Sequence, residues 1–488
     1  MLSARRTEPA HAPRKRAPGT PGNLARELMQ RITILLLVLL GGCAFVALYL
    51  YGSFGLVGNA RVTAYSSGIF DMDVGRIVYN LSSDAKGIRT PVHPLIKIFM
   101  LPVVGLVRAI GGTLENPLNA MRLIIALSMA ANSLLCGWLA SQLCHGRLLP
   151  GIAAALISAC SFSALLLGSI PETASLSALS TVVPLVYLNH RHTRPFSWGE
   201  ALVWSLIAVF CITFTVTQIV HFLIAIGARG YLARRHGEPL GRALVRAPWP
   251  KLASLVLVFA ILSGGLAELQ RALYRDTPVF YHGPGIAHEQ RYIRLGLIAN
   301  EPVRHTASVF SQLLIYDFAA PRPGFSDNIP FFRNAPFWSI SLEETRPSQW
   351  TAWHWLVIAL LCAALVIAAA SLRRANLLFL APALSVSSQF ALHYFYGREY
   401  VLYSGNWHGV LVALLVAATF RAFPRHGVRC ATAASLLAAL LLANNLATLD
   451  WVYRQVESGL EASLRDGEGE LLAHPPPGVR PAGAVRWP

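Results

Sequence analysis

Apolar runs of about 20 residues recur from one end of this chain to the other, and they restrict its fold more than any other feature. The first extends from Ile32 to Tyr51, and the last lies at 430–448. Hydrophobic residues make up 54% of the 488 residues and charged residues only 13%, which is more apolar than a soluble core requires. The chain is therefore predicted to be a multi-pass membrane protein.

The membrane-spanning elements are predicted to be helices. Lipid offers no water to backbone groups, so each run must satisfy its own hydrogen bonds, and no alternating strand pattern of a barrel is present. The expected fold is an all-α, polytopic membrane bundle with about eleven spans (10–13) and short helices in the first outer loop. The spans are expected near 31–51, 94–110, 119–141, 148–168, 172–189, 199–227, 251–269, 353–371, 376–395, 405–421 and 430–448.

The basic residues indicate the orientation of these spans. The net charge is +17, but Lys and Arg cluster at the ends of apolar runs, which indicates topology and not a nucleic-acid partner. With the N-terminal tail inside, the first loop, 270–350, 396–404 and the C-terminal tail fall outside. One basic connection, "NHRHTRPF" at 189–196, also falls outside in this count. Either a segment between 94 and 227 is re-entrant, or the run 199–227 crosses the membrane twice.

The seven cysteines lie in or beside apolar segments, so neither a disulfide framework nor a cysteine metal site is expected.

The boundaries of the spans divide the chain into five parts. The parts are a disordered basic cytoplasmic tail (1–30), an N-terminal transmembrane module (31–269) with the outer loop 52–93, an outer-face loop region (270–350), C-terminal transmembrane helices (351–448) and a partly disordered tail (449–488).

The first outer loop concentrates ionisable groups in an otherwise apolar region. In a helix, Asp73 and Arg76 would share a face, whereas Asp71 would point about 200° away from Asp73. Further on, "RTPVHPL" (89–95) leads into the next apolar run, and its prolines would hold Arg89 and His93 near the mouth of the bundle as an anion site. The alternatives are a solvated loop with a local ion pair and a cap-region histidine without a partner.

These motifs resemble the GT-C glycosyltransferases, which include protein O-mannosyltransferases and aminoarabinose transferases. The likeness rests on a first-loop acid, the basic H-P-L entry, "IPETASLSAL" (170–179) and "YGREYVLYSGNWHG" (396–409). The first-loop pattern departs from the Asp-Glu pair of the mannosyltransferases, because it is D-x-D. The resemblance implies transfer of a sugar from a polyprenyl-phosphate donor to an envelope lipid, glycan or protein acceptor at the outer face of the membrane.

The resemblance also implies roles for particular residues. A base must take the acceptor proton and cations must stabilise the departing phosphate. The D-x-D pair makes a divalent cation optional, and no metal site is predicted. The expected catalytic residues are Asp73 and Asp71, the donor-phosphate ligands are Arg76, Arg89, His93 and Arg398, and the substrate-binding residues are Glu172, Glu399, Tyr403 and His408.

A secondary transporter or a lipid-linked-sugar flippase is the main alternative. Transporters place ionisable groups or broken helices near the bilayer midplane, whereas Glu172, Glu200 and Glu268 lie at segment ends here. Gln218 and His221, inside an apolar run, favour the transporter. A non-catalytic scaffold for envelope assembly is the third alternative.

The residue bias suggests where the protein resides. Its Ala, Arg and Leu content fits a high-GC bacterium, so we expect the cytoplasmic membrane, with the site facing the periplasm. Asn80-Leu81-Ser82 is a glycosylation acceptor sequence, which keeps an endoplasmic-reticulum origin as an alternative.

Overall fold

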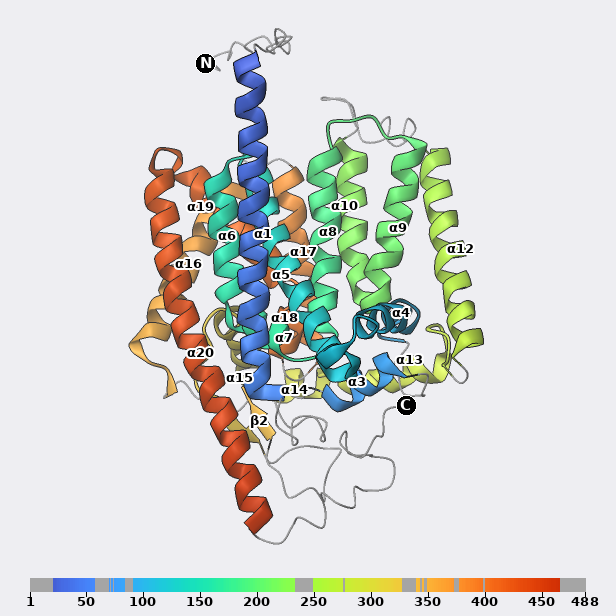
Figure 1. Cartoon of the computed structure of the whole chain (residues 1–488), viewed down its shortest axis with the longest axis vertical. Helices are drawn as coiled ribbons and strands as arrows, with labels where there is room; N and C mark the ends of the chain where they lie inside the picture. The colour runs from blue at the N-terminus through green and yellow to red at the C-terminus, as the bar shows by residue number, and fades with distance from the viewer. Residues whose placement is uncertain are drawn as a thin grey trace.

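A computed structural model of the chain gives an almost entirely helical protein (Figure 1). It describes residues 21–57, 70, 72, 74–83, 91–232, 249–274, 277–326, 339–342, 345, 349–372, 377–397 and 400–465. The longer helices lie alongside one another and form the bundle, and the predicted all-α membrane fold is confirmed in this form. They are α1 (Pro21–Val57), α5 (Pro117–Leu143), α6 (Leu148–Cys160), α7 (Phe162–Ser169), α8 (Ala174–Arg191), α9 (Trp198–Phe214), α10 (Ile219–Leu232), α12 (Trp249–Leu273), α16 (Ala352–Leu372), α17 (Leu377–Phe395), α19 (His408–Ala422) and α20 (Gly427–Arg465).

Short elements connect these helices, and several gather at one end of the bundle. We call the end where α3, α4, α13 and α14 lie the loop end (Figure 1). The short elements are α3 (Val74–Ser82), α4 (Ile96–Arg108), η1 (Gly112–Glu115), η2 (Val216–Gln218), α13 (Gly283–Glu289), η3 (Gln290–Tyr292), α14 (Leu295–Asn300), α15 (Pro302–Phe310), the π-helical η4 (Ser311–Tyr316), β1 (Gly324–Ser326), β2 (Ser339–Ser341), α18 (Tyr400–Ser404) and η6 (Pro424–His426).

The predicted count of about eleven spans is not confirmed. Within the described residues, six helices are long and apolar enough to cross a membrane, or seven if α6 and α7, bent by 61°, form one span. The segment 94–110, expected to be a span, is instead the 13-residue helix α4. At about 1.5 Å per residue it is about 20 Å long, short of a hydrocarbon core of about 30 Å. It lies at the loop end, near α3 (Figure 1).

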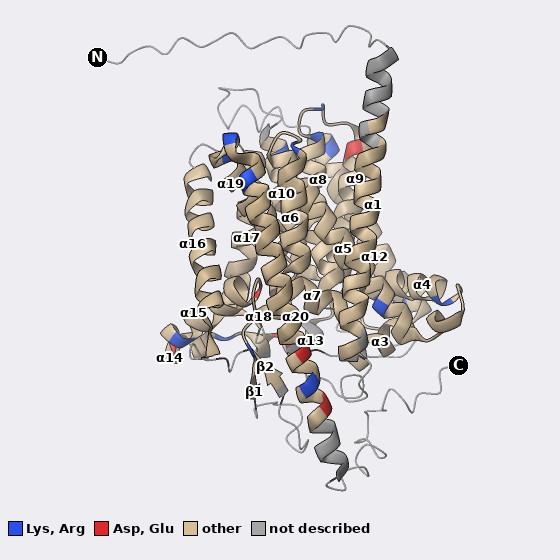
Figure 2. Cartoon of the chain, turned by 60° about the vertical axis from the view of Figure 1, so that its left-hand side comes forward, with Lys and Arg blue, Asp and Glu red and all other residues tan. Residues whose placement is uncertain are grey.

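The run 199–227 is interrupted. It forms α9 and α10, which are separated at η2 and run antiparallel, so that Arg229 near the end of α10 contacts Glu200 in the first turn of α9 at 2.8 Å. Because α4 does not run through the bundle, residues 189–196 lie at the same end as the start of α1, which removes the conflict over this connection (Figure 1). We call this end, with residues 145–147, 189–197 and 424–427, the basic end. In Figure 2 the ribbon at this end carries several blue Lys and Arg positions.

Helix α5 lies within the bundle and packs against α1, α6, α8 and α19. Its close approach to α6 depends on glycine, because a Cβ atom built at Gly137 would lie 2.6 Å from the carbonyl oxygen of Gly151. Small residues of this kind let the backbones of membrane helices come near each other.

Helical structure extends into both segments expected to be terminal tails. Helix α1 begins at Pro21, inside the tail expected at 1–30, and α20 continues to Arg465, well past the expected start of the last tail at 449. The extension of α20 is supported by a buried Val452 and by an Asp450–Arg454 ion pair of 2.9 Å at i,i+4 spacing. Hydropathy does not detect such a helix, because its exposed face is polar.

The outer-face region 270–350 consists largely of short helices where it is described. β1 and β2 pair antiparallel within it. The backbone N–H of Phe70 donates to the carbonyl oxygen of Ile340 at 2.8 Å. The first outer loop and this region are therefore joined at the loop end.

Candidate functional site at the loop end

The described site residues all lie at helix termini on the loop-end side of the bundle. His93 precedes α4, Glu172 precedes α8, Tyr403 belongs to α18 and His408 opens α19. The remaining predicted residues, Asp71, Asp73, Arg89, Arg398 and Glu399, lie outside the described residues. For Arg76 only the backbone, within α3, is described.

His93 is fixed against the break between α9 and α10. Its Nδ1 contacts the carbonyl oxygen of Phe214, and because a carbonyl only accepts, Nδ1 is the donor. The backbone N–H of Val216 donates to the carbonyl oxygen of Val92 at 2.8 Å. His93 is therefore not a cap-region residue without a partner, since it connects the entry of α4 to the interrupted span.

The polar face of α8 meets the same break. The hydroxyls of Ser177 and Thr215 are 2.7 Å apart, and Thr181 donates to Oε1 of Gln218 at 2.6 Å. These contacts pair the polar side chains of the break with α8, while its freed backbone groups, the carbonyl of Phe214 and the N–H of Val216, pair with residues 92–93. Specific side-chain contacts from α8 thus stabilise the break.

Deeper in the bundle, α10 packs against α17, and both helices carry buried polar side chains. His221 is fully buried, and neither of its ring nitrogens has a hydrogen-bond partner among the described residues. The same holds for Nε2 of Gln218 and Oε1 of Gln389. His393 stacks on Tyr403 with ring centroids 4.5 Å apart and an interplanar angle of 21°. We call Gln218, His221, Gln389, His393 and Tyr403 the polar cluster.

An unpaired buried polar atom costs about 1–3 kcal/mol unless water or a ligand satisfies it. Several such atoms in one region therefore indicate groups that the fold does not use for its own hydrogen bonds. Tyr403 is the member of the polar cluster that the sequence predicted, whereas His393 and Gln389 were not foreseen. Both lie in α17, where they interrupt an apolar run, and this interruption was the available signal.

His408 belongs to a second buried arrangement that the sequence did not predict. Its Nδ1 contacts Oδ2 of Asp317, and the hydroxyl of Ser404 donates to Oδ1 of the same carboxylate at 2.8 Å. Asp317 is 0% exposed, and Nε2 of His408 has no hydrogen-bond partner in the described part of the chain. The carboxylate orients the imidazole, and Nε2 makes no hydrogen bond within the described part of the chain. Burial raises the pKa of the adjacent Tyr316, which keeps that hydroxyl protonated.

Glu172 occupies the turn between α7 and α8. Its Oε1 accepts from the backbone N–H of Thr173 at 2.8 Å and from the Thr173 hydroxyl at 3.0 Å. The turn is close to α18, since α18 packs against α7 and a Cβ built at Gly405 would lie 2.0 Å from Leu167. Glu172 and Tyr403 therefore come from neighbouring elements.

The segment around the late motif is held by the outer-face region. Nε of Arg294 donates to the carbonyl oxygen of Gly397 at 2.8 Å, and the N–H of Tyr400 donates to Oε1 of Gln312 at 2.9 Å. Gly397 has a φ of 108°, and a Cβ there would lie 2.5 Å from the ring of Tyr403. Gly397 and Tyr400 are thus both anchored to the outer-face region.

Among the described residues no group of three or more His, Cys, Asp or Glu side chains is placed to hold a metal ion. Comparison with protein-family models and with curated proteins finds no match to this chain.

Proposed function

We propose that this chain is an integral membrane glycosyltransferase. It transfers a sugar from a polyprenyl-phosphate-linked donor to an envelope lipid, glycan or protein acceptor at the outer face of a bacterial cytoplasmic membrane. In this proposal α8, α9, α10 and α19 cross beside the longer spans and complete a bundle of about eleven crossings. The loop end faces the periplasm, because the basic end stays inside.

The observation that carries the proposal is the meeting of separate chain segments at the loop end. His93 follows the first outer loop and contacts the α9–α10 break, and Gln218 at that break leads into the polar cluster with Tyr403. A membrane enzyme needs such polar groups where a lipid-linked donor enters from the bilayer. The short helices and the two joined outer regions form the side of the proposed site that faces water.

The proposed reaction breaks the bond between the anomeric carbon of the sugar and the phosphate oxygen. The acceptor oxygen forms the new bond, its proton goes to the carboxylate of Asp73, and the polyprenyl phosphate leaves with the electron pair. Arg76, Arg89 and Arg398 are the proposed ligands of the departing phosphate, because guanidinium groups match phosphate oxygens in pairs. Asp71 is the neighbouring acid and does not receive the proton of the acceptor.

Transfer activity of paired variants tests this assignment. Purified wild type, Asp73→Asn and Asp71→Asn would be incubated with a radiolabelled polyprenyl-phosphate sugar and a membrane-lipid acceptor extract. Asp73→Asn should lose about 100- to 10,000-fold in rate, the usual range for a general base, because asparagine cannot accept the proton. Asp71→Asn should retain measurable transfer. Equal rates in both variants and wild type would refute the mechanism, and equal detergent elution profiles control for folding.

Transport is the second candidate, favoured by one observation. His221 and Gln218 lie buried within the bundle, beside an interrupted helix, as the ion or substrate sites of transporters do. Proteoliposomes separate the two functions. A transporter would move a labelled lipid-linked sugar across the bilayer without forming a new product. The enzyme would instead form a new glycoside. His221→Phe should reduce the yield of this glycoside without changing the side of the membrane on which it forms.

A further inference from the structure

A cavity opens at the basic end, far from the loop end, between the start of α6 and the turn from α19 to α20. Its volume is about 630 Å³. Among its lining residues are three arginines, Arg147, Arg425 and Arg429, with His426 next to them. The described lining residues include no acidic side chain. The cavity therefore concentrates positive charge from two parts of the chain that are distant in sequence.

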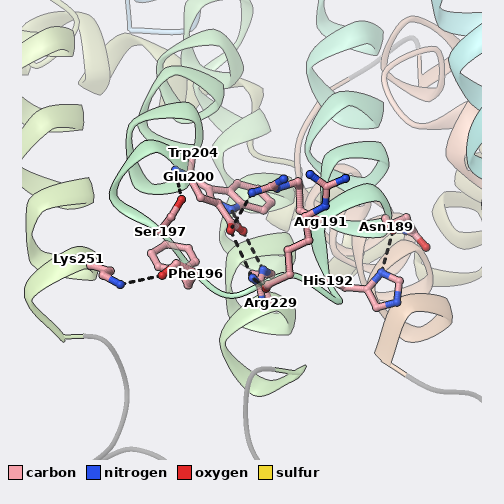
Figure 3. A network of polar contacts seen from close by, with 10 residues as sticks. Asn189, Arg191, His192, Phe196, Ser197, Glu200, Trp204, Arg229 and Lys251 are labelled. Atoms are coloured by element: carbon pink, nitrogen blue, oxygen red, sulfur yellow. Dashed lines mark hydrogen bonds and ion pairs between the residues drawn. The ribbon is translucent and has the colours of Figure 1, made fainter. Parts of the chain in front are cut away.

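Several other cations of the basic end have partners, in the network that joins α8, α9, α10 and α12 (Figure 3). Arg229 pairs with Glu200 at 2.8 Å, and Lys251 donates to the carbonyl oxygen of Phe196 at 2.8 Å. Even Arg421, close to the cavity, lies 5.1 Å from the ring of Phe379.

The three cavity arginines have no such partners. Their guanidinium groups form no hydrogen bond or ion pair with any described residue. Like charges held near one another repel, and a bound anion relieves this repulsion. Positive residues placed only as topology signals have no need to converge on a cavity.

The helix ends at the cavity also carry partial positive charge. Helix α6 begins at Leu148 and α20 begins at Gly427, so the N-terminal ends of both helices adjoin the cavity. Neither helix has an acidic residue in its first turn. The partial positive charge of each N-terminus thus adds to that of the arginines.

The rim of the cavity is apolar, which indicates the source of the anion. Leu148, Leu149 and Val428 adjoin the arginines and are 46%, 39% and 71% exposed. In a membrane these side chains suit acyl chains, while the arginines suit a phosphate at headgroup level. A soluble anion would use the charges and leave the apolar rim without a role.

We propose that this cavity binds the phosphate headgroup of an anionic phospholipid from the leaflet at the basic end. The lipid connects the start of α6 to the α19–α20 turn and so stabilises the packing of these helices. The site is separate from the proposed active site, and it would exist equally in a transferase and in a transporter.

Lipid retention and thermal stability of the delipidated, full-length protein test the proposal. Cardiolipin or phosphatidylglycerol should raise the melting temperature of the wild type and remain bound in native mass spectrometry, whereas phosphatidylcholine should do neither. Arg425→Gln and Arg429→Gln should each weaken retention about fivefold, which corresponds to about 1 kcal/mol per arginine. The control Arg304→Gln removes an arginine that is 73% exposed at the loop end and should retain lipid like the wild type.

Two results would overturn the proposal. Equal retention of anionic lipid by the wild type and by both cavity variants would show that the arginines do not bind it. An equal thermal shift with inorganic phosphate would show a soluble-anion site and exclude the lipid as its specific ligand.

Discussion

Removal of the carboxylate of Glu200 should destabilise this protein strongly, because that group neutralises a buried arginine. Glu200 is 2% exposed and Arg229 is 1% exposed (Figure 3). Oε1 of Glu200 accepts from Nε of Arg229 at 2.8 Å and from Nε1 of Trp204 at 3.4 Å. Arg191 adds a longer contact of 3.8 Å to the same carboxylate.

The expected magnitude follows from this burial. Loss of one partner of a buried ion pair leaves an uncompensated charge and costs about 3–5 kcal/mol. Glu200→Leu should lower the free energy of unfolding by that amount. The double variant Glu200→Leu, Arg229→Met replaces the pair by apolar groups of similar size, so most of the lost stability should return.

Reversible unfolding in mixed detergent micelles, followed by circular dichroism, measures these differences. Asp450→Asn is the matched control, because its ion pair with Arg454 is short at 2.9 Å but exposed, with side-chain exposures of 55% and 72%. Such surface pairs contribute about 0–1 kcal/mol. If Glu200→Leu costs no more than the control, or if the double variant is as unstable as the single one, the reasoning fails.

Four further outcomes are expected. Gly409→Ala should destabilise by about 1–3 kcal/mol in the same unfolding assay, since its Cβ would lie 2.0 Å from the Cys136 sulfur. Gly264→Ala, where nothing lies within 4 Å of the new atom, should be neutral or stabilising. In intact cells an impermeant maleimide should label His282→Cys and spare Thr193→Cys, and the reverse pattern would overturn the orientation. Asn445→Ala should lower the melting temperature, because this side chain donates to two carbonyl groups at 3.0 and 2.7 Å.

The sequence alone determined the class of fold and the general form of the loop end. Apolar runs long enough to cross a bilayer specify membrane helices, because each segment must be apolar and must satisfy its own backbone hydrogen bonds within the hydrocarbon layer. The charges at the ends of the runs likewise depend only on local composition. His93, Glu172, Tyr403 and His408 were named from the sequence, and all four lie at helix termini on one side of the bundle. Their proposed roles remain predictions.

The tertiary structure decided which apolar runs are single straight helices and which polar groups meet. Hydropathy cannot distinguish α4, too short to span, from a true crossing, nor detect that 199–227 divides at Thr215, where α8 supplies partner hydroxyls. The contact of Asp317 with His408 joins residues far apart in sequence. A one-dimensional pattern reports how each segment partitions into lipid, whereas these pairings depend on the distances that packing creates between segments.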